Sequence, residues 1–166
     1  MAEASAYARM FPVSWEELHR NCKALAWRLI ERGPFNGIVA ITRGGLVPAA
    51  IVARELDIRL IETICCSTYD KTSRRDSVAM LKTPEAALAK GGEGWLIVDD
   101  LVDTGVTAKA VRDMLPRAHF ATIYAKPAGR PMVDSYVTEV SQDTWILFPW
   151  DQEAVMSKPI AELRKG

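Results

Sequence analysis

The spacing of apolar residues predicts a helix near the start of the chain. Ser14 and Glu17 form a capping-box pattern, in which the serine caps the helix and the glutamate follows three positions later. Apolar side chains then recur on one helical face, at Leu18, Cys22, Leu25 and Leu29. The Gly33-Pro34 pair ends this helix, because glycine favours a helix end and proline cannot continue the helix.

Strands are predicted by short runs of β-branched and other apolar residues, at residues 38–41, 58–66, 95–98 and 119–125. Helices are expected over 46–56 and 109–115, and Pro48 is compatible with the first turn of the earlier one. This alternation predicts an α/β fold with a mostly parallel, twisted sheet and helices on both faces. In such sheets ligands bind beyond the carboxyl ends of the strands.

Two segments depart from this alternation. Residues 67–94 are weakly periodic and carry basic residues such as Arg74 and Arg75, which predicts a mobile basic loop or a partly disordered segment. Further along, several prolines separate short β-like runs, which predicts a small hood or flap at the sheet edge over about 126–152. The hood is too short to fold alone, so residues 1–166 are expected to form a single domain.

Length and composition bound the class of protein. The chain has 166 residues, of which 49% are hydrophobic, so it can bury a core without disulfides or a structural metal. Its 21 Lys and Arg residues balance 21 Asp and Glu residues, which argues against nucleic-acid binding through a broad basic face. Any anion site must therefore be local. The three cysteines form no disulfide or metal-binding pattern, and no signal peptide or long apolar run is found, so a cytoplasmic location is expected.

The strongest chemical feature is the acidic segment at residues 98–107, where a buried strand is expected to end. Asp99 and Asp100 are adjacent, so they point to opposite faces of the strand and meet different parts of a ligand across its tip. From Asp103 to Thr107 the chain offers backbone N–H groups, hydroxyls and a helix N-terminus, a combination that binds phosphate. A polar loop with a helix cap explains the threonines but not three clustered carboxylates, which favour Mg²⁺ and sugar hydroxyls as ligands.

A second anion site is predicted at the turn after the first strand. Gly44 and Gly45 let the backbone approach a ligand closely, and Arg43 supplies a positive charge. Such a turn is often purely structural, and this one lacks the lysine of a Walker A loop and the spacing of a dinucleotide fingerprint. Together with the acidic segment, it nevertheless places two phosphate sites at two strand ends. That arrangement suits a phosphorylated sugar diphosphate.

These motifs resemble those of a known enzyme family. Residues 98–107 resemble the phosphoribosyl diphosphate signature of type I phosphoribosyltransferases, in which two acids precede a Thr-Gly-x-Thr turn. Residues 42–48 are similar to the pyrophosphate loop of bacterial members of the family that act on xanthine and guanine. Val106 stands where the family usually has a second glycine. The likeness continues through further segments and covers most of the chain, with matches at 67–70, 124–131 and 143–146.

The resemblance implies a type I phosphoribosyltransferase fold and a purine salvage reaction. Ribose 5-phosphate would pass from phosphoribosyl diphosphate to guanine and xanthine, and more weakly to hypoxanthine, with release of pyrophosphate. Mg²⁺ is the implied cofactor and a homotetramer the implied assembly. The family is also found weakly at the inner face of the membrane. No nucleic-acid partner is expected.

Most of the matched residues are implied to bind phosphoribosyl diphosphate. Arg43, Gly44 and Gly45 would hold the pyrophosphate, and Arg75, with Arg74 as the less favoured choice, would fold over it. The acidic segment would hold the ribose, the metal and the 5-phosphate, with Asp100 on the metal side. Its implied binding residues are Asp99, Asp100, Leu101, Val102, Asp103, Thr104, Gly105, Val106 and Thr107.

The resemblance also implies a purine site. Asp103 would be the general base at purine N7, and Lys126 would donate to the 6-oxo group. Trp145 would stack on the ring, and Ile146 would present its backbone carbonyl to the 2-position. By composition alone the latter two are ordinary core residues, and the matching context favours the binding roles. The peptide bond that precedes Arg43 is implied to be cis.

Two other functions stay open. Hypoxanthine-guanine transfer would use the same phosphate sites and differ in the pocket for the 2-position of the purine. A non-catalytic regulator of the same fold that binds nucleotide and RNA would need a basic face. The balanced charge, Asp103 and Arg43 speak against that regulator.

Overall fold

The structure is a computed structural model that describes residues 8–69, 77–151 and 160–163. The chain divides into two compact units. One unit combines residues 1–18 with residues 143–166, and the other consists of residues 19–142. The second, larger unit contains the main sheet.

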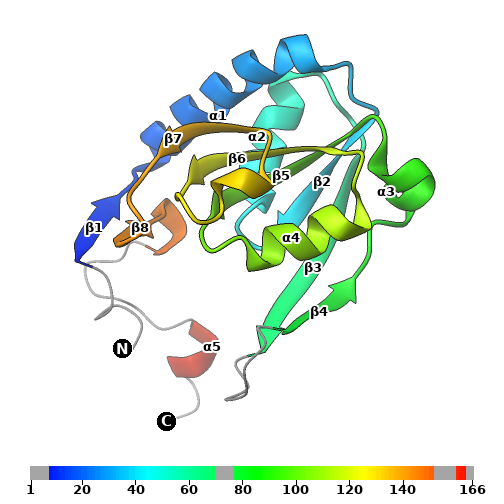
Figure 1. The fold of residues 1–166 in the computed structure, drawn as a ribbon. Helices are drawn as coiled ribbons and strands as arrows, with labels where there is room; N and C mark the ends of the chain where they lie inside the picture. Colours follow the sequence, from blue (N-terminus) through cyan, green and yellow to red (C-terminus); the bar gives the residue numbers. More distant parts are fainter. Residues whose placement is uncertain (1–7, 70–76, 152–159, 164–166) are drawn as a thin grey trace. The chain divides into compact units, whose positions relative to one another are not determined.

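The larger unit is built on a six-stranded sheet with the order β4-β3-β2-β5-β6-β7 (Figure 1). Its strands are β2 Gly37–Thr42, β3 Ile61–Tyr69, β4 Ser77–Lys82, β5 Trp95–Val102, β6 His119–Ala125 and β7 Ser135–Glu139. All neighbouring strands are parallel except β3 and β4, which are antiparallel. The predicted mostly parallel α/β sheet is therefore confirmed.

Helices cover both faces of this sheet, with α3 and α4 on one face and α1 and α2 on the other (Figure 1). The first helix begins where the capping pattern predicted, because the Ser14 hydroxyl accepts a hydrogen bond from the backbone N–H of Glu17 at 3.1 Å. The α-helices are α1 Trp15–Leu29, α2 Leu46–Glu55, α3 Glu85–Leu88 and α4 Val106–Met114. Short 3₁₀ helices follow α1, α3 and β6, namely η2 Ile30–Arg32, η3 Ala89–Gly92 and η4 Arg130–Met132.

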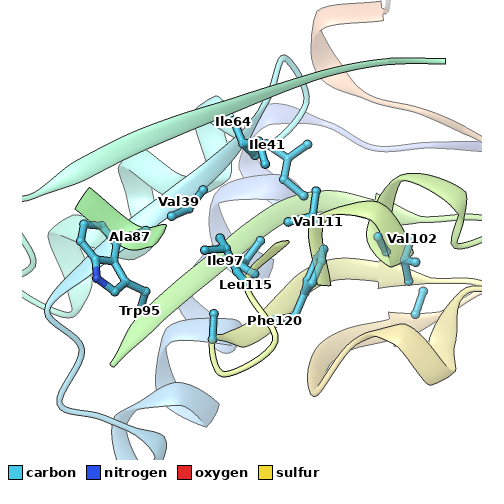
Figure 2. Close-up of a cluster of buried hydrophobic side chains, with 13 residues drawn as sticks. Val39, Ile41, Ile64, Ala87, Trp95, Ile97, Val102, Val111, Leu115 and Phe120 are labelled. Carbon is cyan, nitrogen blue, oxygen red and sulfur yellow. The ribbon is translucent and has the colours of Figure 1, made fainter. Parts of the chain in front are cut away.

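A hydrophobic core lies between α4 and the central strands. Val111 of α4 and Leu115, the residue directly after α4, pack in one buried cluster with Ile97 of β5 and Phe120 of β6 (Figure 2). Each of these four side chains is at most 1% exposed. Burying side chains of this size contributes about 1.5–3 kcal/mol each. This packing fixes α4 against the strands, so the N-terminus of α4 has a defined place at the end of β5.

The smaller unit contains a two-stranded parallel sheet, formed by β1 Arg9–Pro12 and β8 Thr144–Leu147. Trp145 pairs with Met10 and Ile146 with Phe11. The 3₁₀ helix η5 Pro149–Asp151 follows β8, and α5 Ile160–Leu163 lies further along the chain. The rings of Phe148 and Trp150 stack with their centroids 4.8 Å apart. The stacked rings and the strand pair hold this unit together.

The segment 67–94 differs from the sequence prediction. β3, β4, α3 and η3 take up most of it, so the prediction of a loop is wrong for most of residues 77–92. The structural reason is packing, since Met80 of β4 and Cys66 of β3 lie together against the buried cluster. Residues 70–76 lie outside the described residues.

Element boundaries also shift. The strand predicted over 58–66 lies at Ile61–Tyr69, and the helix predicted over 109–115 begins three residues earlier, at Val106. The hood expected over 126–152 is divided, because its residues up to Gln142 belong to the larger unit. In the part of the chain that the structure describes, no helix is both long and apolar enough to cross a membrane.

Leu115→Ala is expected to lower the free energy of unfolding by about 2–5 kcal/mol, because it removes a fully buried side chain from the cluster beneath α4. Chemical denaturation followed by circular dichroism measures this loss. The matched control is Leu81→Ala, at a side chain on β4 that is 62% exposed, which is expected to change stability by less than about 0.5 kcal/mol. Equal losses from the two variants would contradict the assignment of the core.

Candidate active site

Two turns meet at the carboxyl edge of the sheet. β2 and β5 are parallel neighbours, so the turn from β2 into α2 and the turn from β5 into α4 leave the sheet at the same edge. A Cβ atom added to Gly44 in the first turn would collide with the carboxylate of Asp100 in β5. The structure therefore brings the two predicted anion sites together.

Close packing explains the two glycines of the first turn. An added Cβ on Gly45 would lie 2.5 Å from the carbonyl oxygen of Val98 and 2.7 Å from that of Ile41. No side chain fits there, since the turn passes directly over the strand backbones. The peptide bond between Thr42 and Arg43 is cis, as the resemblance implied, and the Arg43 side chain is exposed. The exposed guanidinium of Arg43 can thus approach an anion at this turn, whereas the Gly45 N–H is already bonded to the carbonyl oxygen of Ile41 at 2.8 Å.

The acid pair lies inside β5, and its two members meet different surroundings. The Asp100 carboxylate faces the backbone of Gly44, whereas Asp99 lines a cavity beside the turn into α4. The Asp99 carboxylate accepts a hydrogen bond from the backbone N–H of Asp100 at 2.9 Å. Burial, and then the neighbouring Asp100 carboxylate, raise the pKa of Asp99 well above its usual range. A cation or a sugar hydroxyl at this pair would relieve that unfavourable charge.

The turn from β5 into α4 encloses a small cavity of about 130 Å³. Gly105 has a φ of +88°, a left-handed conformation that favours glycine, and it directly precedes the first residue of α4. The first N–H groups of a helix have no acceptor within the helix, and the helix dipole is positive there. The cavity is lined by Asp99, Leu101, Val102, Asp103, Thr104, Gly105, Val106, Thr107, Ala108 and Phe120. Its shape and its polar groups suit a phosphate monoester.

Asp103 is joined to two side chains from other elements. Lys126, the residue after β6, places its Nζ 3.0 Å from Oδ2 of Asp103 and is only 1% exposed. Gln142 donates from Nε2 to Oδ1 of the same carboxylate at 2.7 Å. A buried ammonium needs a negative partner, and Asp103 supplies it. The resemblance placed both Asp103 and Lys126 in the purine site, without predicting their contact, and sequence reasoning missed Gln142, whose only signal was its position directly before the matched segment 143–146.

The remaining residues that the resemblance names lie in the smaller unit or outside the described residues. Trp145 and Ile146 lie on β8 of the smaller unit, so their expected contacts with a purine stay predictions. Arg74 and Arg75 lie outside the described residues, and so does their predicted closure over pyrophosphate.

Mg²⁺ fits the donors at the acid pair. Among the residues that the structure describes, no three His, Cys, Asp or Glu side chains are grouped to hold a metal ion. Mg²⁺ does not require such a group, because it commonly binds through one or two carboxylates, waters and substrate phosphates. The Asp100 carboxylate occupies the space that a side chain at Gly44 would need, so a hard oxygen donor lies directly at the first anion turn.

Comparison with known proteins identifies the family. The model of the phosphoribosyl transferase domain matches residues 14–155. The chain belongs to this family. Phosphoribosyltransferases of known structure have a similar fold: a purine phosphoribosyltransferase from Pyrococcus horikoshii superposes with a TM-score of 0.75 at 26% identity, covering 90% of this chain and 99% of that one. The type I phosphoribosyltransferase fold implied by the sequence is therefore confirmed.

Curated members of the phosphoribosyltransferase family are similar over almost the whole chain. Xanthine-guanine phosphoribosyltransferase from Nitratidesulfovibrio vulgaris strain DP4 is 63% identical over 160 residues, which are 96% of each chain. The enzyme of the same name from Desulfotalea psychrophila is 60% identical over 93% of this chain and 94% of its own. A structure named as a xanthine-guanine-hypoxanthine phosphoribosyltransferase from Helicobacter pylori, at 21% identity and a TM-score of 0.72, supports the fold.

Because the ionised form of Asp99 is unfavourable in the folded protein, Asp99→Asn is expected to raise the free energy of unfolding by an amount that depends on pH. The folded protein holds the Asp99 proton more tightly than the unfolded chain does, since the pKa is raised on folding. The contribution of Asp99 to wild-type stability therefore falls as pH rises above the ordinary Asp pKa of about 3.9. The variant has no such group, so its free energy of unfolding should exceed that of the wild type increasingly from pH 4 to pH 8. Denaturant titrations without Mg²⁺ measure the difference.

The control for this prediction is Asp113→Asn, an exposed carboxylate of α4 paired with Lys109 at 2.7 Å. Its effect is expected to stay within about 0.5 kcal/mol at every pH. An Asp99→Asn effect that does not grow between pH 4 and pH 8 would contradict the raised pKa.

Proposed function

We propose that this protein transfers ribose 5-phosphate from phosphoribosyl diphosphate to guanine and xanthine, and more weakly to hypoxanthine. The products are the purine nucleoside monophosphate and pyrophosphate, as purine salvage requires. The 60–63% identity to enzymes named xanthine-guanine phosphoribosyltransferase supports this substrate class. Hypoxanthine-guanine transfer and a non-catalytic regulator are less favoured, because neither accounts for that similarity.

The observation that carries the proposal is the pairing of Asp103 with Lys126. A 6-oxopurine presents a donor, the N7–H group, beside an acceptor, the 6-oxo oxygen, on one edge. Asp103 supplies an acceptor and Lys126 a donor, with the two groups 3.0 Å apart. Adenine presents an amino donor at position 6, which would face the ammonium of Lys126 unfavourably. This complementarity supports 6-oxopurines over adenine.

Chemically, the C1′–O bond to the diphosphate breaks and a C1′–N9 bond to the purine forms. The purine loses its N7 proton to the Asp103 carboxylate, which acts as general base. Positive charge develops on the ribose as the diphosphate leaves, so the site must hold three groups in line: the 5-phosphate, the sugar and the purine.

Each phosphate has a matching turn. We assign the 5-phosphate to the cavity at residues 103–107, where the N-terminus of α4 favours an anion. Pyrophosphate is assigned to Arg43, Gly44 and Gly45, with Arg75 as the residue expected to close over it. Asp99 and Asp100 would hold the ribose hydroxyls and Mg²⁺, with Asp100 on the metal side. When bound there, Mg²⁺ would neutralise charge on the departing diphosphate.

A homotetramer in the cytoplasm completes the proposal. Trp27 and Ile30 of the first helical segment are 74% and 54% exposed, and exposed apolar side chains of this size are typical of subunit interfaces. Weak association with the inner face of the membrane stays a prediction.

A substrate assay tests the activity directly. The purified protein, phosphoribosyl diphosphate and Mg²⁺ are incubated with guanine, xanthine, hypoxanthine or adenine, and nucleotide and pyrophosphate are quantified. We expect kcat/KM for xanthine to lie within about tenfold of that for guanine, and adenine to be rejected by about 10⁴-fold. Xanthine used far more slowly than guanine would favour hypoxanthine-guanine transfer, and no product with any base would favour the non-catalytic regulator.

Asp103→Asn tests the general base. Turnover with guanine is expected to fall by about 10²–10⁴-fold, because the amide cannot accept the N7 proton. The affinity for phosphoribosyl diphosphate, measured by calorimetry, is expected to stay near that of the wild type. Asp113→Asn, the same change at an exposed site on α4, serves as the control and is expected to retain activity. Unchanged turnover in Asp103→Asn would discard the assignment, provided that thermal unfolding shows the variant to be folded.

A further inference from the structure

Gln142 makes two hydrogen bonds that link two turns of the site. Its Nε2 donates to Oδ1 of Asp103 at 2.7 Å, and its Oε1 accepts the backbone N–H of Ala128 at 3.0 Å. The Ala128 N–H is only a donor, so the amide oxygen must face it and the amide NH₂ must face the carboxylate. The orientation of the Gln142 side chain is thus fixed by its partners.

The segments around Gln142 are held in place by backbone contacts. Val140, just after β7, donates to the carbonyl of Ala125 at 3.0 Å, which ties the start of this segment to the end of β6. In the turn after β6, an added Cβ on Gly129 would lie 2.7 Å from the carbonyl oxygen of Asp103. The two turns therefore touch directly, and Gln142 bridges them a second time through side chains. Such support limits the motion of a side chain that needs a set direction.

Because of Gln142, the two oxygens of the Asp103 carboxylate have different partners. Oδ1 receives the Gln142 amide, and Oδ2 lies 3.0 Å from Nζ of Lys126. The purine edge needs its proton acceptor beside the group that donates to the 6-oxo oxygen. Oδ2 satisfies this requirement, because it is the oxygen next to Lys126. A carboxylate free to rotate would present either oxygen, and often at the wrong angle.

We propose that Gln142 is a positioning residue for the general base. It holds Oδ1 of Asp103, so that Oδ2, beside Lys126, receives the N7 proton of the purine: the N–H bond breaks and an O–H bond forms at that oxygen. This inference rests on the proposed function and adds to it a residue that contacts neither the purine nor the diphosphate.

Two substitutions of Gln142 remove different parts of its hydrogen bonding to Asp103 and Ala128. Gln142→Glu keeps an oxygen for the Ala128 N–H but replaces the donor to Asp103 with a second carboxylate oxygen. Gln142→Leu removes both hydrogen bonds. For both variants kcat with guanine is expected to fall by about 10- to 100-fold, the scale of loss when a reacting group is misplaced by a fraction of an ångström to one ångström. KM for phosphoribosyl diphosphate is expected to change by less than about twofold, since Gln142 bonds to the Asp103 carboxylate, whereas the backbone N–H groups of the turn would hold the 5-phosphate.

Glu139→Gln is the matched control. Glu139 lies three residues earlier, at the end of β7, and its carboxylate pairs with Arg130 at 3.3 Å. Its substitution is expected to leave both kcat and KM unchanged. A loss of kcat in Glu139→Gln equal to that in Gln142→Glu would show that any change after β7 disturbs the enzyme, and would overturn the proposal.

The decisive readout is a double-mutant cycle with Asp103→Asn. If Gln142 acts through Asp103, adding Gln142→Leu to Asp103→Asn should lower kcat by no more than about twofold further. A residue with a merely structural role would lower kcat by the same factor in both backgrounds, which would overturn the inference. Full turnover in Asp103→Asn would contradict both the general-base assignment and this inference. Loss in Asp103→Asn together with wild-type kcat in folded Gln142→Leu and Gln142→Glu would remove the positioning role alone.

Discussion

The parallel pairing of β2 with β5 is the constraint on which the site depends. Parallel neighbours end at the same edge, so the glycine turn after β2 and the acidic turn after β5 are adjacent, although more than fifty residues separate them in the chain. The fit is close enough that Gly44 leaves no room for a side chain beside the Asp100 carboxylate. One strand pairing and two glycines thus bring together the two turns that are proposed to bind the two ends of a phosphorylated sugar diphosphate.

The chain has zero net charge, yet three of its carboxylates, those of Asp99, Asp100 and Asp103, lie within five residues of one another. The ionised form of Asp99 is destabilised, because burial and the Asp100 carboxylate both raise its pKa. Asp103 is in the opposite situation, since Lys126 and Gln142 both donate to its oxygens. One carboxylate pair is therefore unfavourable until a cation or hydroxyl joins it, whereas the next carboxylate is already satisfied. That contrast supports the proposed roles, in which the pair binds ribose and metal and Asp103 accepts a proton.

Elements that depend on residues close together in the chain could be predicted from the sequence. The Ser14 cap, the strands buried on both faces and the glycine turn are set by residues close in the chain, and each was predicted within a few residues. β4 was missed, because it depends on Met80 packing beside Cys66 of a partner strand rather than on a periodic pattern. Gln142 was missed for a related reason. A glutamine in a loop has no local signature, and only the fold places its amide against Asp103.

The proposed roles of Asp103 and Lys126 do not account for every step of purine selection. These two residues would contact the edge formed by N7 and the 6-oxo group, which guanine, xanthine and hypoxanthine have in common. They cannot distinguish these three bases, which differ only at the 2-position, on the other side of the ring. In the proposed site Asp103 and Lys126 would therefore reject adenine, and selection among the 6-oxopurines would need other residues, for which the resemblance names Trp145 and Ile146.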